Sequence, residues 1–156
     1  MHVELREALP GDAKEIRALV EVVLPATYDP IDPRYAAREL ERWEVEDIPA
    51  TLEDGVFVVG EVNGRIIGLV SATIDDRDRF VMSTLHVHPD FQGQRVGTRL
   101  LNEVVDLVDD RALWTRYPEG DDNAAAFCQR NGFGVAEVVD DPPFPRQVWA
   151  RLDRDR

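Results

Sequence analysis

The dipeptide Asn63-Gly64 constrains the fold more than any other feature of the sequence. Both residue types tolerate the positive φ that a two-residue hairpin turn requires. Runs rich in β-branched residues flank the pair at residues 55–62 and 65–74, and both are predicted to be strands. An acidic turn then leads to a third predicted strand at residues 80–88. The centre of the chain is therefore expected to form an antiparallel sheet.

The other elements follow from hydrophobic periodicity and from the positions of proline and glycine. The predicted helices cover residues 12–24, 34–43, 94–108 and 123–131, and the further strands cover residues 3–7, 113–117, 134–139 and 147–152. Residues 25–33 are expected to be a loop because they contain three prolines, and residues 142–145 a rigid connector. This order predicts a mixed α/β sheet with helices on its faces.

Length and charge narrow the function classes. The 156 residues suit one domain covering residues 1–156, and 31 acidic against 18 basic residues give a formal charge of −13. Such a charge disfavours binding to nucleic acid or to anionic membranes, which leaves enzymes, small-ligand binders and interaction domains. The charge slightly favours cationic or amine partners.

The cysteine count and the first residues point to a compartment. Cys128 is the only cysteine, so no internal disulfide and no cysteine-ligated zinc site is expected, and no metal is predicted. Residues 1–7 carry acidic residues and no apolar run, unlike a signal peptide. No stretch is long and apolar enough to span a bilayer. We therefore expect a cytoplasmic protein.

The passage from strand to helix at residues 88–97 is the best place to look for a ligand. Gly93 and Gly97 lie near the start of the predicted helix, where they allow close approach of a ligand to the backbone. Free N–H groups and the helix dipole favour an anion there, such as a pyrophosphate. The Gly-Lys-Ser/Thr ending of a Walker loop is absent.

Two motifs give the chain a family resemblance. The first consists of Val87-His88-Pro89, Gln92 and the run Gly97-Thr98-Arg99-Leu100-Leu101. The second consists of Ala124, Phe127, Arg130 and Gly132-Phe133. At this separation they resemble the signatures of the GCN5-related N-acetyltransferase (GNAT) superfamily, whose members transfer acyl groups from coenzyme A to amines. The resemblance implies a mostly antiparallel sheet of six to seven strands flanked by about four helices.

The resemblance also implies a donor site and a reaction, most simply transfer of an acetyl group from acetyl-CoA to an amine of a small molecule, peptide or protein. The main-chain amides of Leu85, His86 and Val87 would face the thioester and its developing oxyanion. The residues expected to bind the cofactor are Leu85, His86, Val87, Gln92, Gly93, Gln94, Arg95, Val96, Gly97, Thr98 and Asn123.

Three positions depart from the family pattern. Arg95 stands where the signature has its first glycine, so its side chain could add a charge contact with the pyrophosphate. Cys128 aligns with the family tyrosine, which is often proposed to protonate the leaving thiolate. Asp121 aligns with the family asparagine, and Asn123 follows two residues later.

The catalytic candidates are His86, Tyr117 and Cys128. His86 has a suitable intrinsic pKa for a base, about 6.5, but strand alternation predicts that it faces away from the side shared by Val81, Ser83 and Leu85. Tyr117 could replace the missing tyrosine as the acid. Glu61 at the hairpin and a water chain are alternative routes for the amine proton, whereas His88 is expected to be exposed.

The acceptor side and two other functions remain open. Tyr28, Asp29, Asp32 and Trp43 lie in the region that lines the acceptor side in the family, where acidic and aromatic groups would suit an ammonium; packing of a proline-rich loop is the alternative. A coenzyme A-binding module without catalysis is the second functional reading, and an interaction domain without cofactor is the third. Exposed strand edges make a homodimer reasonable.

Overall fold

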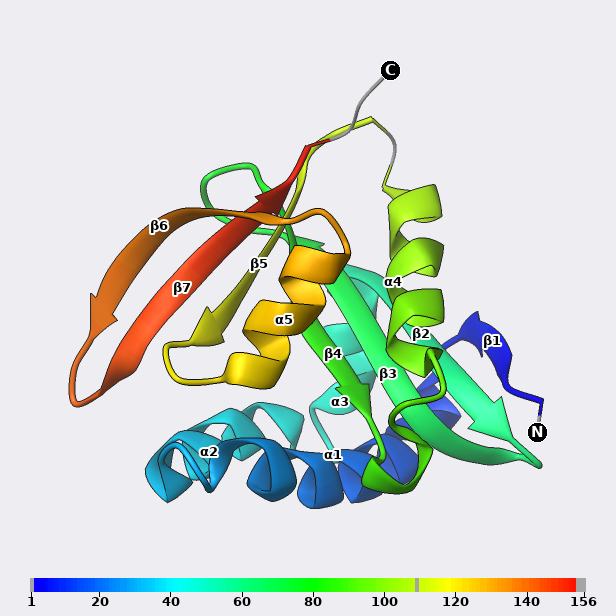
Figure 1. Ribbon diagram of the computed structural model, residues 1–156. Helices are drawn as coiled ribbons and strands as arrows, with labels where there is room; N and C mark the ends of the chain where they lie inside the picture. Colours follow the sequence, from blue (N-terminus) through cyan, green and yellow to red (C-terminus); the bar gives the residue numbers. More distant parts are fainter. Residues whose placement is uncertain (1, 109, 154–156) are drawn as a thin grey trace.

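The computed structural model describes residues 2–108 and 110–153. Seven strands form one sheet in the order β1-β2-β3-β4-β5-β7-β6 (Figure 1). Their bounds are β1 Glu4–Glu7, β2 Gly55–Val62, β3 Arg65–Ile74, β4 Phe80–Val87, β5 Leu113–Pro118, β6 Gly134–Asp141 and β7 Phe144–Leu152. Every neighbouring pair is antiparallel except β4 and β5. The predicted fold class is confirmed.

Within the described ranges, five α-helices cover the two faces of the sheet. They are α1 Ala13–Tyr28, α2 Pro33–Leu40, α3 Ile48–Thr51, α4 Val96–Leu107 and α5 Asp122–Arg130. One core cluster joins α4 and α5 to the sheet, and a second joins α1, α3 and the short 3-10 turn Glu41–Trp43 to its other face. Among the described residues, no helix is long and apolar enough to cross a membrane.

The Asn63-Gly64 hairpin forms as predicted. The two residues have φ of 52° and 79°, and Val62 pairs with Arg65. On the same strand pair, Gly68 lets α4 pack closely on β3, because a Cβ at this position would lie 3.0 Å from Leu100 Cδ1. The hairpin therefore fixes the register of β2 and β3, and the glycine fixes the distance of α4 from the sheet.

Strands β4 and β5 pair only where they begin. Their register joins Phe80 to Leu113, Val81 to Trp114 and Met82 to Thr115. The Thr115 hydroxyl closes this pairing by donating to the Met82 carbonyl oxygen over 3.0 Å. Beyond it the strands diverge toward their carboxyl ends, with α5 beside the gap (Figure 1). We call the part of the sheet between residues 83–87 and 116–118 the β4–β5 opening.

One predicted helix boundary near a proline is wrong. Helix α1 continues through Pro25 to Tyr28, where a loop was expected. Pro25 deprives only the Glu21 carbonyl of its donor, and Glu21 lies on the exposed face where water can replace it. The continued turn is stabilised by the Asp29 N–H, which donates to the Pro25 carbonyl, and by Tyr28 packing edge-on against Tyr35.

Two further segments differ from the prediction. The short helix α3, which was not predicted from the sequence, contains Pro49 within its first turn, a position that tolerates proline. Strand β7 begins at Phe144, so Phe144 and Pro145 belong to the strand and not to the connector. Pro145 lies near the start of this strand, where a missing donor is tolerated.

Candidate active site

The turn before α4 presents backbone N–H groups to solvent. Gly93 and Arg95 both adopt a positive φ, 81° and 64°, which directs the chain into the helix. The first hydrogen bond of the helix is donated by the Arg99 amide to the Arg95 carbonyl oxygen. The amides of Val96, Gly97 and Thr98 precede this bond and point out of the helix N-terminus. This end of α4 therefore has the geometry of an anion-binding site.

Two contacts hold this turn in place. The side-chain amide of Gln92 donates to the Val87 carbonyl oxygen over 3.1 Å, which ties the turn to the end of β4. Gly97 faces α5, because a Cβ there would lie 3.4 Å from Phe127 Cε1. The two sequence motifs thus meet in space. Gln92 acts here on the backbone, which is a positioning role that the spacing alone did not predict.

Arg95 carries a conformational cost that a glycine would avoid. The left-handed conformation destabilises the folded state by roughly 1–2 kcal/mol for an L-residue. Glycine avoids this cost, but its greater conformational entropy in the unfolded chain offsets part of the gain. We expect Arg95→Gly to raise the free energy of unfolding by about 0.5–1 kcal/mol. Urea denaturation of Arg95→Gly and Arg95→Ala measures this effect. An equal change in both variants would contradict a backbone origin.

A bulge in β4 changes which side chains share a face, and corrects the predicted alternation. Thr84 pairs with Ser71 and Val81 with Thr73, so β4 has one residue more than β3 between these pairs. Such a bulge reverses the direction of the side chains that follow it. Leu85 consequently packs toward α4, and it does not share the face of Val81 and Ser83 as the sequence predicted.

The same register assigns the main-chain amides. The His88 amide donates to the Ile67 carbonyl oxygen of β3, and N–H groups alternate in direction along a strand. The His86 amide therefore faces β3, whereas the amides of Leu85 and Val87 face the β4–β5 opening. Of the three amides expected to contact a thioester, those of Leu85 and Val87 face the opening, whereas that of His86 faces β3.

The His86 side chain lies on the face of α1, opposite to its predicted direction, because it follows the bulge and pairs with Leu69. The residue is only partly exposed. Burial, aided by the positive charge of Arg42, lowers the pKa of His86 to about 4. His86 is therefore neutral at pH 7, and with such a low pKa it is a weak base for an ammonium.

The depressed pKa of His86 predicts a loss of stability in mild acid. The unfolded chain binds a proton near pH 6.5 and the folded chain only near pH 4, so stability falls as pH decreases through this window. Between pH 7.5 and pH 5 the free energy of unfolding should fall by about 2 kcal/mol from this residue. Urea denaturation measures the free energy of unfolding at both pH values. The difference between the two values should be smaller in His86→Gln than in the wild type, and unchanged in the control His2→Gln. An unchanged difference in His86→Gln would refute the assignment.

Tyr117 of β5 and Cys128 of α5 belong to the same core cluster, on the other side of the sheet, where α4 and α5 pack. Their exposed fractions are 8% and 6%. Burial raises the pKa of Tyr117, with added repulsion from Cys128, and raises the pKa of Cys128 to about 11. Both groups are protonated at pH 7. Among the described residues, the Tyr117 hydroxyl has no hydrogen-bond partner, although Tyr117 belongs to the part of β5 that borders the opening.

Asp121 and Asn123 take different places at the start of α5. Asp121 is buried and caps the helix by accepting from the Ala124 amide over 3.1 Å. Burial raises the pKa of its carboxyl. Asn123, the residue predicted to contact the cofactor, is exposed in the first turn of the helix.

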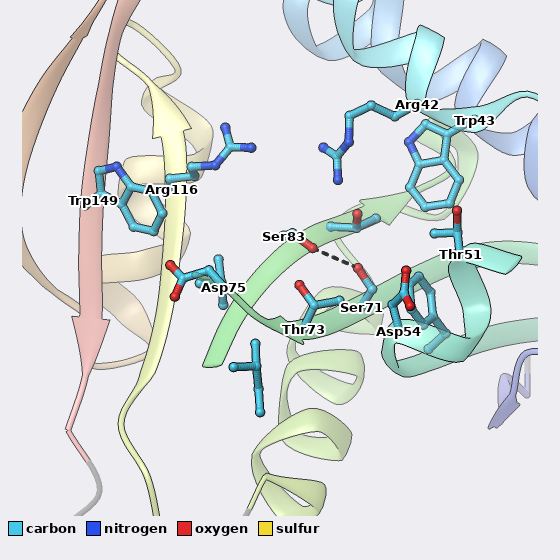
Figure 2. A pocket seen from close by; sticks show the side chains of 14 residues that line it. Arg42, Trp43, Thr51, Asp54, Ser71, Thr73, Asp75, Ser83, Arg116 and Trp149 are labelled. Atoms are coloured by element: carbon cyan, nitrogen blue, oxygen red, sulfur yellow. Dashed lines mark hydrogen bonds between the residues drawn. The ribbon is translucent and has the colours of Figure 1, made fainter. Parts of the chain in front are cut away.

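A polar cleft lies on the face opposite Tyr117 and Cys128, between the 3-10 turn Glu41–Trp43 and strands β3, β4, β5 and β7 (Figure 2). Its volume is about 650 Å³. The floor carries hydroxyl groups, including Ser71 and Ser83, whose oxygens lie 3.2 Å apart. Arg42 and Arg116 extend into it from opposite sides (Figure 2). Sequence reasoning missed both arginines; the alternation of 113–117 could have placed Arg116 opposite Tyr117.

Most residues expected on the acceptor side do not line this cleft. Of Tyr28, Asp29, Asp32 and Trp43, only Trp43 is among its walls. Tyr28 packs against Tyr35, Asp29 is exposed, and Asp32 caps α2 by accepting from the Arg34 amide. These contacts favour the packing alternative for the proline-rich segment.

Glu61, the remaining side-chain candidate for the base, and His88 also have structural partners. Glu61 forms an ion pair with Arg6 over 2.9 Å beside β1, away from the cleft. His88 is half-buried where exposure was expected, because its Nδ1 accepts from the Asp90 amide and caps the turn that follows. Neither residue lines the cleft.

Comparison with known proteins identifies the fold and the family. A model of the Acetyltransferase (GNAT) family matches residues 16–133. The chain belongs to the GNAT acetyltransferase family. This GNAT chain is also 32% identical over 118 residues to an uncharacterized N-acetyltransferase of Methanocaldococcus jannaschii. The matched region covers 67% of this chain and 50% of that protein. The chain thus spans half the length of this curated relative.

Two solved structures share the GNAT fold. The PaiA N-acetyltransferase of Thermoplasma acidophilum, in complex with coenzyme A, has a TM-score of 0.85 at 16% identity over 98% of this chain and 99% of that one. A Salmonella typhimurium protein with its cofactor acetyl-CoA has a TM-score of 0.72 at 18% identity over 100% of this chain and 96% of that one. At these identities the likeness concerns the fold.

Residues of this GNAT chain fit a coenzyme A donor on the structure's own terms. The amides at the start of α4 suit a diphosphate, and beyond Met82 and Thr115 the strands β4 and β5 have no ladder pairing among the described residues, so their backbone groups are available to a ligand arm. Tyr117 is a mostly buried residue whose hydroxyl has no hydrogen-bond partner among the described residues, so this hydroxyl is a group that a ligand would satisfy. The donor would thus lie on the α4 and α5 side, and the cleft remains for an acceptor on the opposite face.

Proposed function

We propose that the protein transfers an acetyl group from acetyl-CoA to a primary amine by direct attack of the amine on the thioester. The observation that carries this proposal is the β4–β5 opening. It lies between an anion-binding helix end on one face of the sheet and a polar cleft on the other face. Two substrates that enter from opposite faces would meet between the strands.

The donor-side residues have separate tasks. The amides of Val96, Gly97 and Thr98 would hold the diphosphate, and Arg95 would add a positive charge beside it. The amides of Leu85 and Val87 would stabilise negative charge that develops on the acetyl oxygen. Acetyl-CoA supplies the activated acetyl group. These tasks depend on backbone direction, so they tolerate the unusual side chains of this chain.

Proton movement is divided between the two faces. The amine nitrogen bonds to the acetyl carbon while the carbon–sulfur bond breaks, and the sulfur leaves with the electron pair. An ammonium acceptor loses two protons in all: one replaces the acetyl group on sulfur, and the other passes to solvent. We assign the proton that reaches sulfur to the Tyr117 hydroxyl, and one of the two protons lost by the amine then returns to the Tyr117 oxygen through water. The amine loses its protons to water in the cleft, because His86 is a weak base.

Thiol release tests the proposed function directly. The purified protein is incubated with acetyl-CoA and a panel of primary amines, and free thiol and acetylated amine are measured against reactions without protein. Product formed only with the protein supports the proposal. Saturable binding of acetyl-CoA without transfer to any amine would favour the coenzyme A-binding module, and no binding would favour an interaction domain. The homodimer and the cytoplasmic location remain predictions from the sequence.

A further inference from the structure

We propose that the acceptor is an α-amino acid with an apolar side chain, whose carboxylate is bound by Arg116 with help from Arg42. This inference rests on the proposed function, because it names the amine that would enter the cleft. The charge of the whole chain points the other way, toward cationic partners, so the identity of the acceptor depends on the local arrangement of charges.

Arg116 keeps its charge available to a ligand. Its guanidinium donates to the Gln147 side-chain oxygen over 3.4 Å, and it faces the Trp149 ring at 6.0 Å. Within the described part of the chain no carboxylate forms an ion pair with it. The nearby Asp141 pairs instead with Arg38 at 2.8 Å. A neutral, buried partner therefore orients Arg116, whose only acidic neighbour among these contacts, Asp141, acts on it through longer-range attraction and not through an ion pair.

Arg42 faces Arg116 from the opposite wall. Figure 2 shows the two guanidinium groups pointing toward one another across the open cleft. Glu39 pairs with one side of Arg42, with nitrogen and oxygen 3.0 Å apart, and the Arg42 side chain remains 41% exposed. Two converging guanidinium groups suit a planar carboxylate, which accepts paired hydrogen bonds from them.

The acidic residues of the cleft do not cancel this charge. Asp75 forms an ion pair with Arg79 over 2.8 Å and also accepts from the Arg77 and Arg79 amides. Asp54 is exposed at the rim, on the side of Thr51 and away from Arg116 (Figure 2). The part of the cleft nearest the β4–β5 opening is therefore positive.

The position of Arg116 sets the spacing within the acceptor. It follows Thr115, the last residue of β5 that pairs with β4, so its side chain leaves the sheet at the opening itself. An acceptor whose carboxylate binds there must carry its amine close to the carboxylate if the amine is to reach the opening. An α-amino acid meets this condition, whereas a peptide N-terminus has no carboxylate so near its amine.

The remaining walls favour an apolar side chain. Trp43, Phe57, Ile74, Val81 and Trp149 supply the carbon surface of the cleft. The hydroxyls of Ser71, Ser83 and Thr84 lie on the floor, where one of them can accept a hydrogen bond from the amine. Carboxylate, amine and apolar side chain would each have a matching wall.

The test compares acceptors that differ only in the carboxylate. Wild-type protein receives acetyl-CoA with L-leucine, leucinamide or isopentylamine, and with L-phenylalanine, its amide or phenethylamine. The amine of the amide is less basic than that of the amino acid, and the amine of the decarboxylated compound is more basic. A difference that has the same sign against both analogues therefore cannot come from basicity. We expect kcat/KM for the amino acid to exceed that of both analogues by about 10- to 100-fold, since a hydrogen bond to a charged group contributes on that scale.

Variants then assign the preference to its residues. In Arg116→Gln the ratio of kcat/KM for amino acid over amide should fall toward one, and in Arg42→Gln it should fall by a smaller factor. Arg77→Gln removes the same charge from an exposed site outside the cleft and should keep the wild-type ratio. A structural defect would lower both rates and leave the ratio unchanged.

Several results would overturn the inference. They are a preference for the amines that lack a carboxylate, an unchanged ratio in Arg116→Gln, or transfer to other amines with none to the amino acids. The proposed function would survive each of these. If calorimetry shows that acetyl-CoA itself does not bind, the proposed function fails, and with it the basis of this inference.

Discussion

Replacing Thr98 by glutamate is expected to weaken acetyl-CoA binding by about 100-fold or more and to leave the protein folded. A carboxylate in the first turn of α4 would lie beside the diphosphate that the free amides are proposed to hold. Two like charges about 4 Å apart repel by roughly 1–4 kcal/mol near a protein surface, and the diphosphate carries more than one charge. Calorimetric titration with acetyl-CoA measures the loss.

The same substitution should stabilise the helix, so binding and folding are expected to change in opposite directions. An acidic side chain near a helix N-terminus contributes about 0.3–1 kcal/mol. Two variants serve as controls. Thr98→Gln introduces a side chain with the shape of glutamate but without its charge, and Asn102→Glu places the same charge one turn further along α4, at an exposed site. Both controls should bind acetyl-CoA within a few-fold of the wild type. Undiminished binding by a folded Thr98→Glu protein would show that the diphosphate lies elsewhere.

Tyr117→Phe should lower kcat by about 100-fold with little change in the affinity for acetyl-CoA. A positioned general acid contributes roughly 10²–10⁴ to a rate. Burial raises the pKa of Tyr117, so the hydroxyl is protonated at pH 7 and available to the leaving sulfur. Its hydroxyl has no hydrogen-bond partner among the described residues, so its removal should cost the fold less than about 1 kcal/mol. Single-turnover thiol release measures the effect.

Cys128→Ala is the matched test at the position of the family tyrosine. A thiol is a weaker hydrogen-bond donor than a hydroxyl, and burial raises the pKa of Cys128 to about 11. We expect kcat within about threefold of the wild type, because general acid catalysis is assigned to Tyr117. Should Cys128→Ala lose more activity than Tyr117→Phe, the two roles would have to be exchanged.

The regular part of the fold is readable in the sequence because its signals are local. Asn63-Gly64 fixes a hairpin through φ, and the apolar spacing of α4 and α5 fixes their buried faces. Pro25 was misread for the same reason: a local signal for helix termination was outweighed by tertiary packing of Tyr28 on Tyr35. Propensity is a weak guide where a buried contact lies one turn further on.

The site is only partly readable because it depends on a bulge and on distant pairs. One additional residue in β4 exchanges the faces of Leu85 and His86, and no composition signal marks it. Environment then moves the pKa of His86 from about 6.5 to about 4. Arg42 and Arg116 line the same cleft only because the 3-10 turn Glu41–Trp43 lies over this part of the sheet. The donor turn was readable, since its glycines and helix start are contiguous.

The most direct test of the account follows an isotopically labelled acetyl group. Wild-type protein is mixed with labelled acetyl-CoA and L-leucine, L-phenylalanine, their amides and their decarboxylated amines, and mass spectrometry examines the small molecules and the intact protein. Direct attack predicts label on the nitrogen of an acceptor amine, with the protein unlabelled throughout. Label retained on Cys128, or bound acetyl-CoA with no labelled amine from any of these acceptors, would contradict it.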